Sequence, residues 1–183
     1  MTTTARSLRD QNRSALLRRR VKVIVAFTIS YNVIEGIIAL VAGTAADSAA
    51  LIGFGLDSGV EVLSATAVAW QFTRREPERY EKPVLRVIAF AFFALAAYTI
   101  VGSTLSLTGV TTPESSGVGI ALAAVSVVVM PLLSVVERRT GRELGSATVV
   151  ADSKQTLICS LLSAAVLLGL VANAVFGWVW ADA

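Results

Sequence analysis

The apolar residues of the chain are gathered in five long blocks, at about 21–42, 48–72, 84–107, 117–136 and 149–172. Each block is close to the ~20 residues that an α-helix needs to cross ~30 Å of hydrocarbon. A helix on a soluble core repeats a polar face every three or four residues, whereas the stretch SVVVMPLLSVV is apolar on all sides. We therefore predict an all-α bundle of five transmembrane helices, in which each helix satisfies its own backbone hydrogen bonds.

The composition narrows the possible functions. The chain has 183 residues, of which 55% are hydrophobic and 16% charged, and it contains one cysteine and no histidine. An imidazole is therefore not available as a metal ligand or proton carrier. No candidate nucleophile stands beside an obvious base, so we do not expect an enzyme.

The basic residues fix an expected orientation. Seven Lys or Arg residues precede or open the first block, five lie between the second and third, three between the fourth and fifth, and Lys154 opens the fifth. The connections GTAADS and LTGVTTPESSG and the end WADA carry only acids. By the positive-inside rule we predict a cytoplasmic basic segment at 1–20 and a transmembrane domain at 21–183, with the N-terminus inside and the C-terminus outside a plasma or inner membrane.

This pattern also explains the high pI of about 9.4. Basic residues beside the cytoplasmic ends of helices are attracted to anionic lipid, each by about 1 kcal/mol. The expected partner of these charges is therefore the lipid bilayer, and nucleic acid is not expected.

Two acids in the second block need an explanation. Asp57 and Glu61 are four residues apart, which places both on one helix face, ~6 Å from each other. A charge at the centre of a bilayer costs about 2.5–3.5 kcal/mol or more, and two like charges repel. A divalent cation binds between them, or a proton is shared there, or both in turn.

Other polar residues are expected at similar depths. Glu35 and Asp57 should both lie ~12–14 Å below the outer surface, while Glu61 and Cys159 share a level nearer the inside. Gln155 is one turn from Cys159 on the same face, and Asn32 is close to one turn before Glu35. Asp152, next to Lys154, is expected at the headgroups, where the fifth helix begins.

A structural role is the alternative for these groups. Protonated acids could hydrogen-bond to Ser58 and Ser64 and merely hold helices together. Cys159 could be a small buried hydrophobic residue and Gln155 an interhelical hydrogen-bonding group. Five glycines in the first two blocks are expected to allow close helix approach, and these are Gly36, Gly43, Gly53, Gly55 and Gly59.

Two segments resemble the cation diffusion facilitator family of metal exporters. The first, SYNVIEGIIALVAGTAADSAALIGFGLDSGVEVLSA, is similar to helices one and two of that family, in which an HxxxD or DxxxD pair binds the ion. The second, ADSKQTLICSLLSAAVLLGL, is similar to the fifth helix, commonly ADAxHxxxDxxxS. The resemblance implies that Asp57, Glu61, Gln155 and Cys159 are metal ligands, with Glu35, Asn32 and Asp152 as secondary candidates.

The chain departs from the family at three points. Gln155 and Cys159 stand where the family has His and Asp, and a neutral amide is a weak ligand. The family usually has six transmembrane helices, whereas this chain stops where a sixth would begin. We expect either a fragment or a shortened relative that completes its bundle as a homodimer. The family's frequent cytoplasmic metal-binding domain is also not expected.

The expected function is transport of divalent metal cations, by analogy export driven by proton antiport. The metal is the substrate, and a thiolate beside carboxylates favours zinc, with cadmium, cobalt, iron and manganese as alternatives. The competing hypothesis is a non-transporting scaffold or regulatory subunit that kept the bundle but lost the full metal site.

Overall fold

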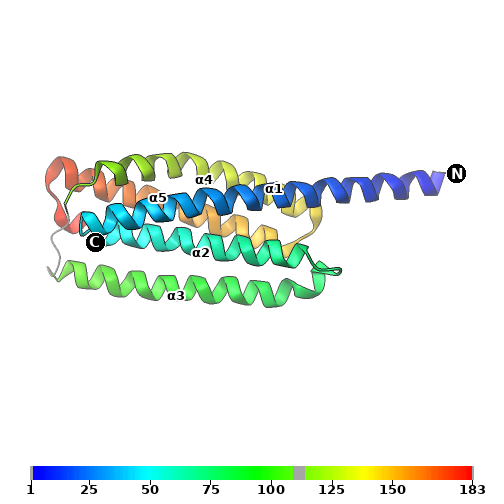
Figure 1. Ribbon diagram of the computed structural model, residues 1–183, viewed down its shortest axis with the longest axis horizontal. Helices are drawn as coiled ribbons and strands as arrows, with labels where there is room; N and C mark the ends of the chain where they lie inside the picture. Colours follow the sequence, from blue (N-terminus) through cyan, green and yellow to red (C-terminus); the bar gives the residue numbers. More distant parts are fainter. Residues whose placement is uncertain (1, 109–113, 183) are drawn as a thin grey trace.

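The computed structural model describes residues 2–108 and 114–182, and it forms a bundle of long helices (Figure 1). The helices are α1 (Thr2–Ala45), α2 (Ala49–Phe72), α3 (Glu81–Leu107), α4 (Gly117–Leu144) and α5 (Ala147–Phe176). Two short 3₁₀ helices, η1 (Pro77–Tyr80) and η2 (Val179–Asp182), lie in the α2–α3 connection and after α5. All five long helices include a segment long and apolar enough to cross a membrane, so the predicted fold class is confirmed.

Short polar residues set the helix boundaries. Ser48, Ser116 and Ser146 precede α2, α4 and α5, and each side chain accepts a hydrogen bond from a backbone N–H of the first turn. Gly145 and Gly177 end α4 and α5 with positive φ angles of 70° and 67°, which glycine adopts without steric cost. The turn between α4 and α5 therefore needs only two residues.

Four helices, α1, α3, α4 and α5, are longer than the sequence blocks indicated. α4 continues to Leu144 and α5 begins at Ala147, so about two further turns of α4 lie within the bundle. The basic residues before the first apolar block belong to α1, which is continuous from Thr2 and extends past the other helices (Figure 1). The apolar part of α1 runs from Leu16 to Ala45.

The bundle has a basic and an acidic end. We call the end with the α2–α3 and α4–α5 connections the basic end, because Arg74, Arg75 and Arg79 lie there. The opposite end, with the α1–α2 connection and Glu114, is the acidic end. In Figure 1, α3 lies at the edge of the bundle beside α2, and α1, α2, α4 and α5 form its body.

Glycines bring α1 and α2 together, although fewer than expected. A Cβ on Gly43 would lie 2.9 Å from the backbone nitrogen of Ile52, and one on Gly55 would lie 2.8 Å from Leu40 Cγ. Gly36 is also in close contact with α2. The prediction was wrong for Gly53 and Gly59, where a Cβ would meet nothing within 4 Å.

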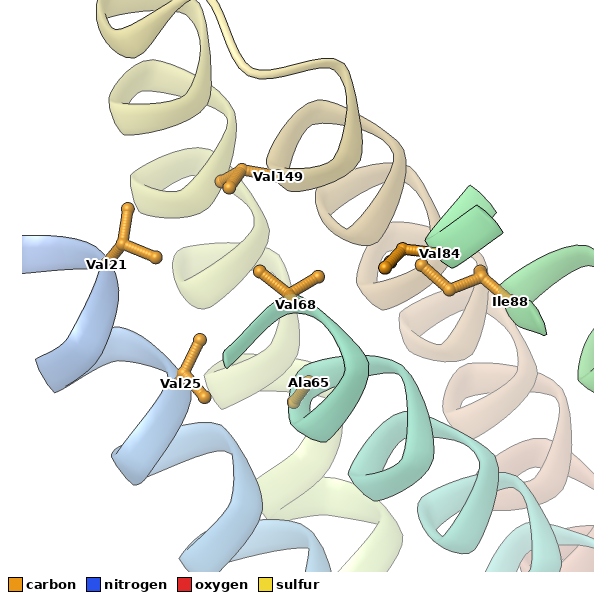
Figure 2. Close-up of a cluster of buried hydrophobic side chains, with 7 residues drawn as sticks. All are labelled: Val21, Val25, Ala65, Val68, Val84, Ile88 and Val149. Carbon is orange, nitrogen blue, oxygen red and sulfur yellow. The ribbon is translucent and has the colours of Figure 1, made fainter. Parts of the chain in front are cut away.

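Two apolar clusters lie at different heights in the bundle. The basic-end cluster joins α1, α2, α3 and α5 (Figure 2), and the acidic-end cluster joins α1, α2, α4 and α5. The first consists of Val21, Val25, Ala65, Val68, Val84, Ile88 and Val149, and the second of Ala39, Leu51, Phe54, Ala123, Val166 and Leu170. Along α1, α2 and α5, the buried residues between the clusters are mostly polar.

Candidate cation site between two apolar layers

The polar layer of the bundle is built by helical periodicity. On α2, Asp57, Ser58, Glu61 and Ser64 recur at spacings of three and four residues, so they share the buried face. The same spacing on α5 buries a second polar row, which consists of Asp152, Gln155, Thr156, Cys159, Ser160 and Ser163. These two rows face the bundle interior, and the acyl tails of a surrounding bilayer would meet the opposite faces.

Four of these side chains form what we call the central site, namely Asp57 and Glu61 of α2 and Gln155 and Cys159 of α5. Each is only 3% exposed. The Cys159 thiol interacts with both the Asp57 and the Glu61 carboxyl groups, as the shared depth of Glu61 and Cys159 predicted. Gln155 lies one turn nearer the basic end on the face of α5 that carries Cys159.

The central site contains polar atoms without hydrogen bonds. Both carboxyl oxygens of Glu61, and both the oxygen and the nitrogen of the Gln155 amide, are buried and have no hydrogen-bond partner. The Cys159 thiol and the Asn32 amide lie near Glu61, but neither makes a hydrogen bond of normal geometry to it. The structural alternative assigned Ser58 and Ser64 to the Asp57–Glu61 pair. Instead, Ser58 donates to Glu35 at 2.9 Å and Ser64 donates to Asp152.

The central site is not a closed coordination sphere. Within residues 2–108 and 114–182, no three Asp, Glu or Cys side chains converge closely enough to hold a metal ion. The Cys159 thiol therefore interacts with Asp57 and with Glu61 separately, and the three groups do not converge on one point. Coordination by Asp57, Glu61 and Cys159 together requires these side chains to move inward.

The secondary candidates of α1 lie on two sides of the central site. Glu35 accepts hydrogen bonds from Ser58 of α2 and Ser126 of α4, and it interacts electrostatically with Asp57. Its carboxylate is thus satisfied across three helices. Asn32 donates to the Thr28 carbonyl at 3.0 Å, and its amide faces Glu61 while its oxygen lacks a partner.

Asp152, which was expected where the fifth helix begins, lies inside the bundle and not on its exposed surface. Its side chain is 6% exposed and accepts a hydrogen bond from Ser64, whereas Lys154 is exposed. Helical geometry explains the difference, because residues 152, 155, 156 and 159 share one face of α5 and residue 154 does not.

Sequence analysis missed Glu137 altogether. It is 1% exposed and accepts hydrogen bonds from Thr28 Oγ1 at 3.3 Å and Thr156 Oγ1 at 3.0 Å. The signal was present in α4, where Ser126, Met130, Ser134 and Glu137 recur on its buried face. The adjacent Arg138 and Arg139 instead suggested that the helix had already left the membrane.

The acids form a continuous row without a buried counter-ion. Electrostatic interactions link Glu35 to Asp57, Asp57 to Glu61, and Glu61 to both Asp152 and Glu137. No Lys or Arg is among the buried side chains of residues 16–105, 107–108 and 114–181. Positive charge for this row therefore has to come from protons or cations.

A groove leads from the central site toward the acidic end. It has a volume of about 280 Å³ and is lined by Asp57, Cys159, Thr99 and Leu162, among residues of α2, α3 and α5. A second cavity of about 290 Å³ shares Thr99 and Leu162 and continues to Ala49 and Ala181. Both are mostly apolar, and they separate much of α3 from α5.

Comparison of the chain with models of known protein families finds no match, and comparison with curated proteins finds none either.

Proposed function

We propose that this multi-pass membrane protein transports divalent metal cations and binds them at Asp57, Glu61, Gln155 and Cys159. The observation that carries the proposal is the pair of buried, unpartnered side chains at this place, Glu61 and Gln155. An unsatisfied buried polar group costs about 1–3 kcal/mol, and more when it is charged. A cation that visits the site gives these oxygens the partner that the protein itself does not supply.

The donor atoms favour a borderline or soft metal. Asp57 and Glu61 offer carboxylate oxygens, and Cys159 offers a sulfur, which as thiolate prefers zinc or cadmium to magnesium. Gln155 is a weak ligand through its amide oxygen. Asn32, whose unpartnered oxygen lies in the same region, is the candidate for completing the coordination.

The proposed transport direction is outward, with the basic end in the cytoplasm. The excess of Lys and Arg at that end supports this orientation. The groove beside Asp57 and Cys159 supplies the start of an outward path. Binding a metal requires deprotonated ligands, so protons that enter from outside displace it from the carboxylates, which makes the exchange an antiport.

The resemblance to the cation diffusion facilitator family supports the same assignment. In that family an HxxxD or DxxxD pair on the second helix and two residues on the fifth helix bind the ion. Here Cys159 of α5 lies beside Asp57 and Glu61 of α2, in the middle of the bundle. The proposal of family membership rests on the segments around DSGVE and ADSKQTLIC.

A second candidate function is a scaffold or regulatory subunit that does not transport. It is favoured by the lack, within the described residues, of three converging Asp, Glu or Cys side chains. Under this hypothesis the bundle is stable without a cation, and metal binding does not depend on Asp57 or Glu61.

Transport by purified protein in liposomes tests the proposal. A zinc-sensitive dye inside the vesicles reports metal entry, with and without a pH gradient. We expect flux for the natural protein, and no flux for D57N or E61Q, which keep side-chain size but remove charge. E114Q is the matched control, because Glu114 is exposed at the acidic end. Equal flux in all four proteins would refute the assignment.

A further inference from the structure

A second group of buried acids lies nearer the basic end than the central site. Asp152 is five residues from the start of α5, and Glu137 is seven residues from the end of α4. At 1.5 Å per residue, they lie ~7–11 Å from the helix ends. We call Glu137 and Asp152 the inner pair. Glu137 interacts electrostatically with Asp152, although the two come from different helices.

Hydroxyl groups from three helices surround the inner pair. Thr28 of α1 and Thr156 of α5 donate to the two carboxyl oxygens of Glu137, and Ser64 of α2 donates to Asp152. Thr156 also lies 3.2 Å from the backbone carbonyl oxygen of Asp152. The four helices that form the body of the bundle thus each contribute a polar side chain to one small region.

An unpartnered group points to a ligand in this region. Glu61 is 3% exposed, and neither of its oxygens has a hydrogen-bond partner. It interacts electrostatically with both Asp152 and Glu137. Three buried acids therefore lie in one region, and the hydroxyl donors satisfy only two of them. Because no three Asp, Glu or Cys side chains within residues 2–108 and 114–182 converge closely enough to hold a metal ion, binding of one ion by all three acids requires them to move inward.

The chemistry of the inner pair differs from that of the central site. All of its donors are oxygens, from carboxylates, hydroxyls and a backbone carbonyl, and it has no sulfur. Such a set suits a hard cation, such as Mg²⁺ or Mn²⁺, which also retains part of its water. The basic-end cluster, with Val68 and Val149, lies between the inner pair and the end of the bundle.

We propose that Glu137 and Asp152, with Glu61 at its inner edge, form a second cation site that takes a hard, oxygen-preferring divalent ion. Thr28, Ser64 and Thr156 are positioning residues that orient the two carboxylates of the inner pair. This inference does not rest on the proposed function, because binding at this site does not require transport.

Mn²⁺ binding to the full chain, purified in detergent, tests this inference, because free and bound Mn²⁺ are distinguished by electron paramagnetic resonance. The D57N/C159S background weakens the central site. In that background we expect about one bound Mn²⁺ per chain, lost when E137Q and D152N are added. E114Q, which removes an exposed acid at the acidic end, should leave the bound Mn²⁺ unchanged.

A conservative variant separates binding from a structural role. E137D keeps a carboxylate, so it should still bind Mn²⁺, but more weakly than the parent, whereas E137Q should not bind it. Size-exclusion elution and the thermal transition identify samples that are folded. If E137Q does not fold, the Mn²⁺ affinity of E137D is compared with that of the parent instead.

Two results would overturn the second site. One is Mn²⁺ binding that persists unchanged when E137Q and D152N are added to the D57N/C159S background, and the other is its complete loss in D57N/C159S alone. Zinc titrations of the same samples report the central site separately. Loss of zinc binding in D57N/C159S with retention in E137Q/D152N would support the central site even if Mn²⁺ binding failed.

Discussion

Ser64 of α2 donates its hydroxyl hydrogen to the carboxylate of Asp152 of α5. It lies three residues from Glu61 on the same helix face, yet it serves an acid of another helix. A serine hydroxyl has a single hydrogen to donate, so Glu61 loses its nearest helical donor through this contact. The Ser64–Asp152 hydrogen bond thus both joins two helices and leaves Glu61 available to a ligand.

Replacing Ser64 should destabilise the fold. S64A leaves a carboxylate of the buried Asp152 without its donor, which costs about 1–3 kcal/mol. T66A is the matched control, because Thr66 is exposed and only bonds back to the Val62 carbonyl. Its free energy of unfolding should change by less than about 0.5 kcal/mol. Chemical denaturation in detergent measures both, and equal values would show that the Ser64 contact contributes nothing.

A methyl group on Gly43 should loosen the α1–α2 contact. Its Cβ would lie 2.9 Å from the backbone nitrogen of Ile52, which cannot move without shifting α2. G43A should lower the free energy of unfolding by about 1–3 kcal/mol. G59A adds the same methyl group in open space, and it should be neutral or stabilise by up to about 1 kcal/mol through helix propensity. Thermal unfolding that ranks G59A below G43A would contradict the packing.

Introducing an imidazole at position 155 should strengthen zinc binding at the proposed site. An imidazole nitrogen is a much better zinc ligand than a neutral amide. We expect Q155H to lower the dissociation constant for zinc roughly tenfold or more. Competition with a chelating dye measures it. An unchanged constant would mean that residue 155 does not reach the metal.

The single cysteine offers a direct reporter of the central site. Cys159 is 3% exposed but lines the groove beside Asp57, so a small maleimide should modify it slowly. Bound zinc should slow the reaction further, because a coordinated sulfur is not free to attack. In D57N/E61Q the same zinc concentration should give no protection. Mass spectrometry over time follows the modification, and protection that persists in D57N/E61Q would remove the carboxylates from the site.

The proposed orientation can be tested with introduced cysteines in a C159S background. R75C lies at the basic end and E114C at the acidic end, and both positions are exposed. If the positive-inside rule holds, an impermeant thiol reagent added to intact cells should label E114C but not R75C. The opposite pattern would reverse the proposed direction of export.

The helices were predictable because hydrophobic blocks of membrane length carry an unambiguous signal. Their ends were not, since the same signal cannot distinguish a helix that stops from one that continues with a polar, buried turn. α4 runs to Leu144, beyond the expected end at 136, and this extension is what places Glu137 inside the bundle.

The candidate site was predictable in part. The i and i+4 spacing of Asp57 and Glu61, and the matching depth of Cys159, could be obtained from helix geometry alone. Hydrogen-bond partners could not, because they depend on how each helix is rotated about its axis. Asp152 illustrates this, since its neighbour Lys154 suggested a headgroup position while its own face points toward Ser64.

Zinc titration of the purified full chain by calorimetry tests the central claim most directly. We predict one class of site, with about one zinc per chain, that is present in the natural protein and E114Q and absent from D57A/E61A. Zinc binding that is equal in all three folded proteins would contradict the account.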